Sequence, residues 1–409
     1  MSKFLPVVCL LVSAVLIVSA RAEPAGSVSH SSTHLPNSGT TTSPALISAP
    51  APASVPGTAP AAGAASVPAV RPPEPLAMPS VMVAHPDKVL VETVTLAGHR
   101  LVAGGLGGLL ILSDDNGASW RQIQLPVRAT LTALHFTDDR NGWAAGHYGV
   151  VLRTQDAGEH WTLVEDGPRA AQAMLEAARA GNEADNVRAQ KIQAAQALAQ
   201  TDPARPFLLI QSSGSDTIRL IGAGILSAET TDGGQHWRPW SDGIGNPEGV
   251  LLDGLASRNG LVLAAGAHGT LLAGKPEDGL HKLPSPYDGT FFGVLDGGSF
   301  GFVLFGQQGH AYASTALGPD WAPGREVAWH AVVNPSQTTL TAGLVRQDGS
   351  VLLGDASGAL WKLGGKPDTP RLDPVPVLAP FPILALAEAP DHALILAGSG
   401  GILRVPPPA

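Results

Sequence analysis

The chain has 409 residues, of which 14% are charged, and its 25 basic and 34 acidic side chains give a formal net charge of −9. This acidic balance makes nucleic acid and anionic membrane surfaces poor partners. The 48 glycines and 36 prolines suit many short strands and turns, and the length allows one large all-β domain with extensions.

The first 22 residues have the pattern of a secretory signal peptide. Lys3 precedes an apolar run over Leu5–Ala20, which ends in the small-residue pattern of Ala20–Ala22. The run is short for a membrane span, and a retained anchor is the alternative. Cys9, the one cysteine, lies inside it, so the mature protein contains no disulfide. We therefore expect a periplasmic protein, with secretion as an alternative.

Residues 23–80 are rich in Ala, Pro, Ser and Thr, and they lack aromatic side chains. Such a segment cannot form a packed core, which predicts a disordered linker. The folded domain is then expected over residues 81–409.

A glycine pair, G-x-x-G in its clearest copies, recurs through this domain and precedes an alternating aliphatic strand. Its first glycines stand at positions 104, 146, 222, 266, 306, 354 and 398, with spacings of 42, 76, 44, 40, 48 and 44. Seven copies at this period predict a seven-bladed β-propeller with four strands in each blade. The last copy ends after its third strand. We expect Val81–Ala84 to supply the missing outer strand, and an open last blade is the alternative.

A second repeat, S/T-x-D-x-G-x-x-W, is the Asp-box, or bacterial neuraminidase repeat. The Asp is expected to accept backbone N–H bonds within its own turn, where Gly supplies a positive φ, and Trp begins the next strand. We assign these structural roles to Asp115, Trp120, Asp156, Trp161, Asp232 and Trp237. A fourth copy, Ser314 to Trp321, has lost the central acid.

The long spacing of 76 residues contains Pro168–Ala204, which is rich in Ala, Gln, Glu and Arg. It predicts a helical hairpin that lies on the propeller surface. Pro168 fits a first helical turn, Gly181 a helix end, and Asp185 the start of the second helix.

Because strands alternate in direction, the glycine loops, the hairpin and the connections between blades share one face, and the Asp-boxes lie on the other. The first face is our candidate partner-binding face. Its candidate contact residues are His147, Tyr148, His268, Gln307, Gln308, Tyr287, Phe291 and Phe292. Each of them has a purely structural alternative in loop geometry or blade packing.

We expect no catalytic residues, no cofactor and no metal. His147 and His268 belong to non-adjacent blades and lack a third ligand at metal-binding spacing. A sialidase-like hydrolase would need a tyrosine nucleophile, an acid/base Asp and three clamping arginines, and the sequence supports this set poorly.

The string Asn141–Thr154 followed by an Asp-box resembles the exported propellers related to the photosystem II assembly and stability factor. The resemblance covers roughly residues 85 to 405. The helical insertion and Gly289–Gly293 resemble a non-photosynthetic bacterial branch, whose members tend to be encoded beside envelope transporters of the resistance-nodulation-division type. The resemblance implies a non-enzymatic periplasmic accessory protein that binds such a transporter complex and does not insert into the membrane itself. A glycan- or small-ligand-binding propeller is the alternative, and a glycoside hydrolase is a further one.

Overall fold

The computed structural model describes residues 74–182, 184–201, 204–224, 226–240 and 251–407. The predicted signal peptide, and the predicted linker up to residue 73, lie outside these residues.

The described strands form seven antiparallel sheets, which we number as blades in chain order. Blade one contains β1 (Val91–Ala97), β2 (Arg100–Gly105), β3 (Leu109–Ser113) and β4 (Arg121–Gln122). Blade two contains β5 (Leu131–Phe136), β6 (Gly142–Gly146), β7 (Val151–Thr154) and β8 (Thr162–Glu165). Blade three contains β9 (Phe207–Ser212), β10 (Ile218–Gly222) and β11 (Ser227–Thr230).

The later blades follow the same order. Blade four contains β12 (Leu252–Arg258), β13 (Leu261–Gly266), β14 (Leu271–Gly274) and β15 (His281–Leu283). Blade five contains β16 (Phe291–Asp296), β17 (Phe302–Gly306), β18 (Ala311–Ser314) and β19 (His330–Ala331). Blade six contains β20 (Leu340–Val345), β21 (Val351–Asp355), β22 (Ala359–Lys366) and β23 (Thr369–Leu378). Blade seven contains β24 (Ile383–Glu388), β25 (Leu394–Gly398) and β26 (Gly401–Val405).

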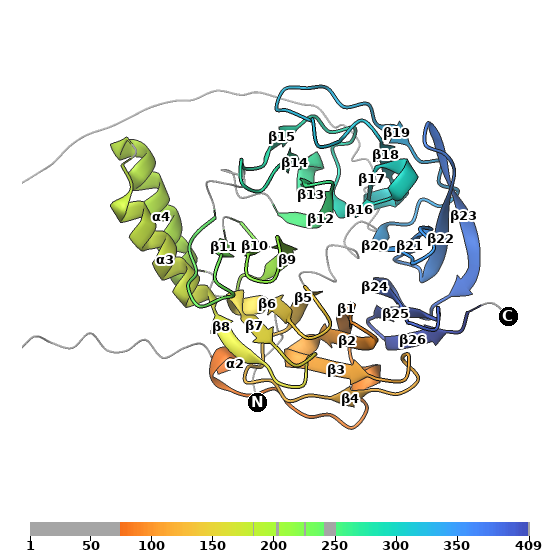
Figure 1. The fold of residues 1–409 in the computed structure, drawn as a ribbon, viewed down its shortest axis with the longest axis horizontal. Helices are drawn as coiled ribbons and strands as arrows, with labels where there is room; N and C mark the ends of the chain where they lie inside the picture. Colours follow the sequence, from red (N-terminus) through yellow and green to blue (C-terminus); the bar gives the residue numbers. More distant parts are fainter. Residues whose placement is uncertain (1–73, 183, 202–203, 225, 241–250, 408–409) are drawn as a thin grey trace, which may run out of the picture. The chain divides into compact units, whose positions relative to one another are not determined.

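The sheets stand around a central axis, with the first strand of each blade innermost (Figure 1). Each inner strand packs on the inner strands of both neighbouring blades, and β1 contacts β5 on one side and β24 on the other. The core consists of apolar layers between adjacent sheets, such as Val102, Leu112 and Leu131 between blades one and two. The predicted seven-bladed β-propeller is therefore confirmed.

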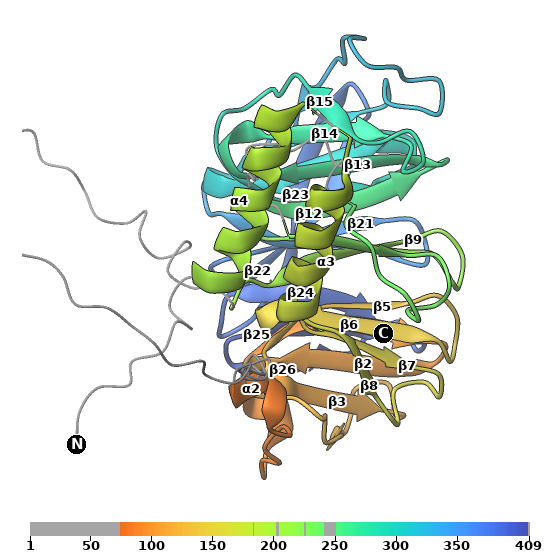
Figure 2. The ribbon, with the colours of Figure 1, turned by 90° about the vertical axis from the view of Figure 1, so that its left-hand side faces the viewer.

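The predicted helical insertion is also confirmed. It contains α3 (Gly167–Ala180) and α4 (Asp185–Thr201), which pack against each other beside blades two and three (Figures 1 and 2). The α3 helix begins where Asp166 accepts a hydrogen bond from the Arg169 backbone N–H at 2.9 Å. Its inner side buries small residues and Met174 against blade three. None of the helices within the described ranges is long and apolar enough to cross a membrane.

The segment before β1 lies on blade one. Helix α2 (Glu74–Ala77) begins the described chain, so regular structure starts inside the stretch predicted as linker. Ser80 donates from its backbone N–H to Leu125 O at 3.0 Å. The Gln122 side-chain amide then donates to Val81 O and accepts from the Val83 N–H, each at 2.9 Å. We call residues 79–84 the strap.

The expectation that Val81–Ala84 completes blade seven is therefore wrong. The strap bonds to the outer strand of blade one, and the described part of blade seven has three strands. The ring closes instead by packing between blades one and seven, where Leu101 and Ile111 meet Ile395 and Ile402. Buried side chains between blades one and seven therefore close the ring, without a strand from the described N-terminal part of the chain in blade seven.

Candidate partner-binding face

The candidate face is built from tight turns that join the second and third strands of the blades. Four of them are single 3₁₀ turns: η3 (Leu106–Gly108), η4 (His147–Gly149), η5 (Ala267–Gly269) and η7 (Gln307–Gly309). Their central residues have positive φ, with 62° at Tyr148, 53° at His268 and 57° at Gln308. We call this side of the ring the turn face.

The glycines of the repeat are required because other backbone crosses them closely. A Cβ at Gly266 would lie 2.0 Å from Leu251 O, in the chain entering blade four. A Cβ at Gly269 would lie 2.1 Å from Tyr287 O, in the connection to blade five. The G-x-x-G pattern thus lets two segments of main chain pass over one turn.

Turn η4 anchors the helical hairpin. Tyr148 and Gly149 donate from their backbone N–H groups to Ala204 O at 3.2 Å and Arg205 O at 2.8 Å, where the chain returns from α4. Gly167, at the start of α3, packs directly on Gly149. The hairpin is thereby fixed beside His147 and Tyr148 at both of its ends.

An aromatic cluster joins blades four and five. Tyr287, in the connection between these blades, stacks on His310 with ring centroids 4.2 Å apart. The His310 and Tyr312 rings are parallel to within 4° and 6.3 Å apart, and Phe291 meets Tyr287 edge-on at 5.8 Å. Tyr287, His310 and Tyr312 are half-buried, so part of each ring reaches the surface. We call these four residues the aromatic cluster.

The structure places the candidate residues unequally. His268 and Gln308 are exposed, while His147, Tyr148, Gln307, Tyr287 and Phe292 are half-buried. Phe291 is 0% exposed, so it supports Tyr287 from beneath and presents no side chain to a partner. His147 and His268 belong to turns of different blades, η4 and η5.

Sequence reasoning missed His310 and Tyr312. Both follow the glycine pair of blade five at alternate positions, and alternate residues of a strand face the same side. This spacing could have indicated that His310 and Tyr312 share a face. It does not reveal that Tyr287 stacks on His310.

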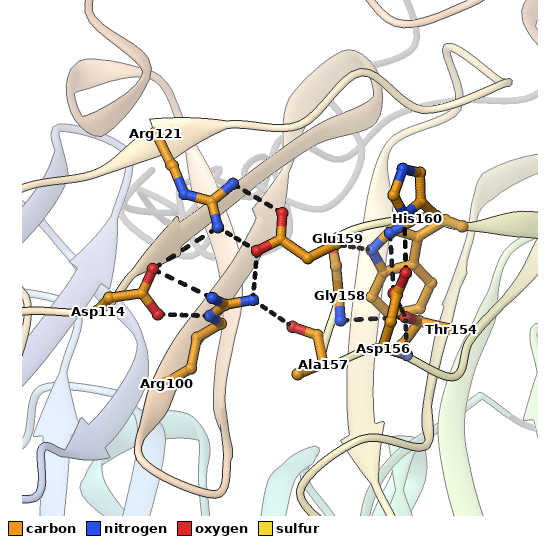
Figure 3. Close-up of polar contacts among 10 residues, drawn as sticks. Arg100, Asp114, Arg121, Thr154, Asp156, Ala157, Gly158, Glu159 and His160 are labelled. Carbon is orange, nitrogen blue, oxygen red and sulfur yellow. Dashed lines mark hydrogen bonds and ion pairs between the residues drawn. The ribbon is translucent and has the colours of Figure 1, made fainter.

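The Asp-boxes lie at the opposite ends of the strands. Asp156 Oδ1 accepts from His160 N at 2.9 Å and Oδ2 contacts His160 Nδ1 at 2.7 Å, while Gly158 N donates to Thr154 Oγ1 at 3.0 Å (Figure 3). Asp115 and Asp232 make the equivalent bonds with Ser119 and His236. Hydrogen bonds from the Ser119 side chain and backbone hold the pKa of Asp115 at about 2. These carboxylates are therefore ionised and satisfied within their own turns.

The tryptophans of the repeat fill the space behind these turns. Trp161 is 8% exposed and donates from Nε1 to Gly158 O at 2.9 Å. Trp120 and Trp237 are half-buried, and Trp237 packs edge-on against Trp143 at 5.9 Å.

Charged side chains join blades one and two beside the Asp-boxes. Arg100 pairs with Asp114 at 2.5 Å and with Glu159 at 2.7 Å, and Arg121 pairs with the same Glu159 at 2.5 Å (Figure 3). Because the two arginines share one glutamate between blades, we interpret this network as structural.

The phenols of Tyr287 and Tyr312 are shifted away from the ionised form. Burial raises the pKa of both Tyr287 and Tyr312 above the usual value near 10, which keeps the phenols protonated. A sialidase-type nucleophile would need the opposite shift. Within the described residues, no three His, Cys, Asp or Glu side chains are grouped to hold a metal ion.

The sheets, turns and repeats define a seven-bladed β-propeller of the Asp-box type. Residues 101–178 match the family described as "Photosynthesis system II assembly factor YCF48". The chain is 36% identical over 61 residues to the chloroplast photosystem II stability/assembly factor HCF136 of Cyanidioschyzon merolae, which covers 14% of each chain. It is 21% identical over 310 residues to the photosystem II assembly lipoprotein Ycf48 of Synechococcus, covering 71% of this chain and 77% of that one.

Solved structures show the same fold. A structure of YCF48 bound to D1 peptide has a TM-score of 0.56 at 16% identity and covers 81% of this chain and 100% of its own. YCF48 from Cyanidioschyzon merolae has a TM-score of 0.55 at 13% identity, with 78% and 96% covered. The resemblance to the assembly-factor propellers therefore holds in sequence and in architecture.

Proposed function

We propose that this chain is a non-enzymatic periplasmic accessory propeller that binds a protein partner through its turn face. The observation that carries the proposal is the aromatic cluster, in which Tyr287 and Tyr312 combine half-buried rings with polar hydroxyl groups. Half-buried tyrosines are frequent energetic centres of protein interfaces. The fold likeness to a YCF48 structure that contains a bound peptide is consistent with this role.

The hairpin is the second support. It is inserted between β8 and β9, and its outward side chains, among them Gln172, Glu176 and Val187, are exposed. Such an arm enlarges the turn face without contributing strands to the ring. We propose that its partner is an envelope transporter complex of the resistance-nodulation-division type, and this identity rests on the bacterial-branch resemblance alone.

The experiment is capture of membrane proteins by the tagged full-length chain after mild crosslinking, with identification by mass spectrometry. Tyr287→Ala should weaken capture by about 2 kcal/mol or more, which is roughly 30-fold. Replacing residues 168–204 with a Gly/Ser bridge should reduce capture. The change also removes Met174 and the small residues that α3 buries against blade three, so its thermal midpoint is measured beside wild type before capture is compared.

The matched control is Phe300→Ala, which truncates a half-buried aromatic residue in the turn between β16 and β17, on the Asp-box side. It should leave capture unchanged once thermal midpoints have been compared. Transporter recovery at wild-type yield by both turn-face variants would contradict the proposal. Binding of the chain to a sugar array, lost on Tyr287→Ala, would favour the glycan-binding alternative.

A further inference from the structure

Blade seven differs from the other blades at its outer edge. Five sheets have four strands. Blade three has three, and in place of a fourth strand Glu229 N donates to Arg238 O at 2.7 Å and Arg238 N donates to Glu229 O at 2.9 Å. Blade seven ends with β26, and no backbone hydrogen bond from another described residue reaches β26 on the side away from β25. An edge of this kind presents unpaired N–H and C=O groups to an incoming strand.

Neither described end of the chain fills this position. The strap is bound to Gln122 and Leu125, and the short turn η2 (Pro86–Lys88) packs against β26 at Gly401 without a backbone hydrogen bond to that strand. Beyond Val405 the sequence continues with three prolines and an alanine. Prolines cannot donate to a strand ladder, so this tail is unsuited to turn back along β26.

The outer strands of other blades show what chemistry the position requires. Three of them bring an apolar side chain into the layer between two blades: Leu163 of β8, Leu283 of β15 at 5% exposure and Leu372 of β23 at 3%. The layer between blades six and seven contains half-buried apolar residues that an added strand could pack against. These include Val375 and Val377 of β23 and Leu403 and Val405 of β26.

We propose that β26 accepts an extended segment of a partner protein as the fourth strand of blade seven. Main-chain hydrogen bonds along Gly401–Val405 would supply much of the affinity. An apolar residue at every second position of the segment would pack toward Val375 and Val377. This surface lies outside the aromatic cluster and the hairpin, so the proposal goes beyond the proposed function.

The sequence disfavours the leader as the occupant. From Pro44 to Pro73 it has a proline at least every eight residues, and residues 23–43 are mostly small and polar, so neither part offers an alternating apolar strand.

The test is hydrogen exchange of the full-length chain, read by mass spectrometry over residues 401–407. The probe is a synthetic peptide of residues 159–166, which contains the outer strand of blade two. At a concentration of 100 times its Kd, it should slow exchange of the outward amides of β26 by up to about 100-fold. The same peptide with Leu163→Pro is the matched control and should give no protection.

A second variant places a fourth strand on the free edge of β26 within the same chain. Residues 406–409 are replaced by an Asn-Gly turn followed by a copy of residues 161–165. Its β26 amides should be protected without peptide, and added peptide should cause no further change. Failure of both the peptide and the appended strand to protect β26 would overturn the proposal, whatever happens in the capture experiment.

Two further outcomes would also overturn it. If β26 is already protected in the full-length chain and loses protection when residues 24–73 are deleted, the leader is the occupant. If protection rises with protein concentration and a dimer sediments, the occupant is a second copy.

Discussion

Arg404, in the last strand of the chain, donates from Nε to the main-chain carbonyl of Asn116 at 2.9 Å, across 288 residues of sequence. Its Nη2 pairs with Asp391 of its own blade at 2.5 Å. Beside them, a side chain at Gly117 would collide with Ile395. The Asp-box turn of blade one therefore sits directly on blade seven, and side chains from both ends of the chain hold the ring closed.

Arg404→Met should lower the free energy of unfolding by about 1–2 kcal/mol, because Asn116 O and Asp391 both lose a charged donor while the aliphatic stem is kept. Urea denaturation measures the change. The control is Arg371→Met. The Arg371 side chain is 57% exposed and pairs with Asp373 in the same strand, so the free energy of unfolding should change by close to zero. If both variants lose the same free energy of unfolding, Arg404 has no special role in closing the ring.

The Asp-box of blade two should carry measurable stability. Asp156→Ala removes acceptors for the His160 and Thr154 side chains and the His160 backbone, and should cost about 1–3 kcal/mol. Trp161→Ala should cost about 3–5 kcal/mol through the cavity it leaves. Asp320→Ala, at an exposed acid in the degenerate fourth copy, should stay within about 0.5 kcal/mol of wild type. Unchanged thermal midpoints for Asp156→Ala and Trp161→Ala would refute the structural role.

Glu92 occupies a position where blades two and six have a threonine that donates a hydrogen bond. The pairing of each inner strand with the second strand of its blade shifts register at the second residue of the inner strand. This residue is Thr132 in blade two and Thr341 in blade six. Their hydroxyls donate to Phe207 O and Ile383 O of the next blade, each at 2.5 Å. A carboxyl group can donate in this way only when protonated. Burial indeed raises the pKa of Glu92 from 4.5 to about 7.

This shift predicts a pH dependence of stability. Between pH 4.5 and about 7 the native state binds more protons at Glu92 than the unfolded state, so stability falls as pH rises through this window. Glu92→Gln should remove the contribution of Glu92 to this fall and stabilise the protein above pH 7 by up to about 3 kcal/mol. Burial also raises the pKa of Glu165 to about 7 and that of Asp253 to about 6, so a shallower fall should remain in the variant. Thermal midpoints from pH 4.5 to 8 provide the measurement, with exposed Glu277→Gln as control. A parallel pH profile for wild type and Glu92→Gln would contradict the assignment.

Local features of the fold could be predicted from the sequence, because turns depend on neighbouring residues. Thr154, Asp156 and Gly158 bond to each other within five positions, so their spacing alone indicates the turn. The burial of Phe291 could not be predicted, since the register shift between Phe291 and Gly293 breaks the alternation of faces. The aromatic cluster was also hidden, because Tyr287 and His310 meet only when blades four and five pack.

The strap was assigned to the wrong blade, and the Gln122 side chain is one of the contacts that hold it on blade one, beside the bonds between Ser80 and Leu125. Counting strands favoured blade seven, where one was missing, whereas the Gln122 amide provides both a donor and an acceptor at strand spacing on blade one. A long-range pairing through a glutamine side chain leaves no periodic trace in the sequence.

Gln122→Ala should therefore release the strap without unfolding the ring. Losing two hydrogen bonds of about 0.5–1.5 kcal/mol each should raise the open population roughly tenfold or more. Thermolysin, which cuts beside apolar residues, should then cleave at Val81–Val83 faster by the same factor, since these side chains are already 53%, 52% and 39% exposed. The control is Gln337→Ala, at an exposed glutamine before β20, which should cleave at the wild-type rate. If Gln122→Ala leaves cleavage unchanged, the bonds of Pro79 and Ser80 hold the strap without Gln122. If it lowers the global thermal midpoint, the strap is part of the cooperative core of blade one.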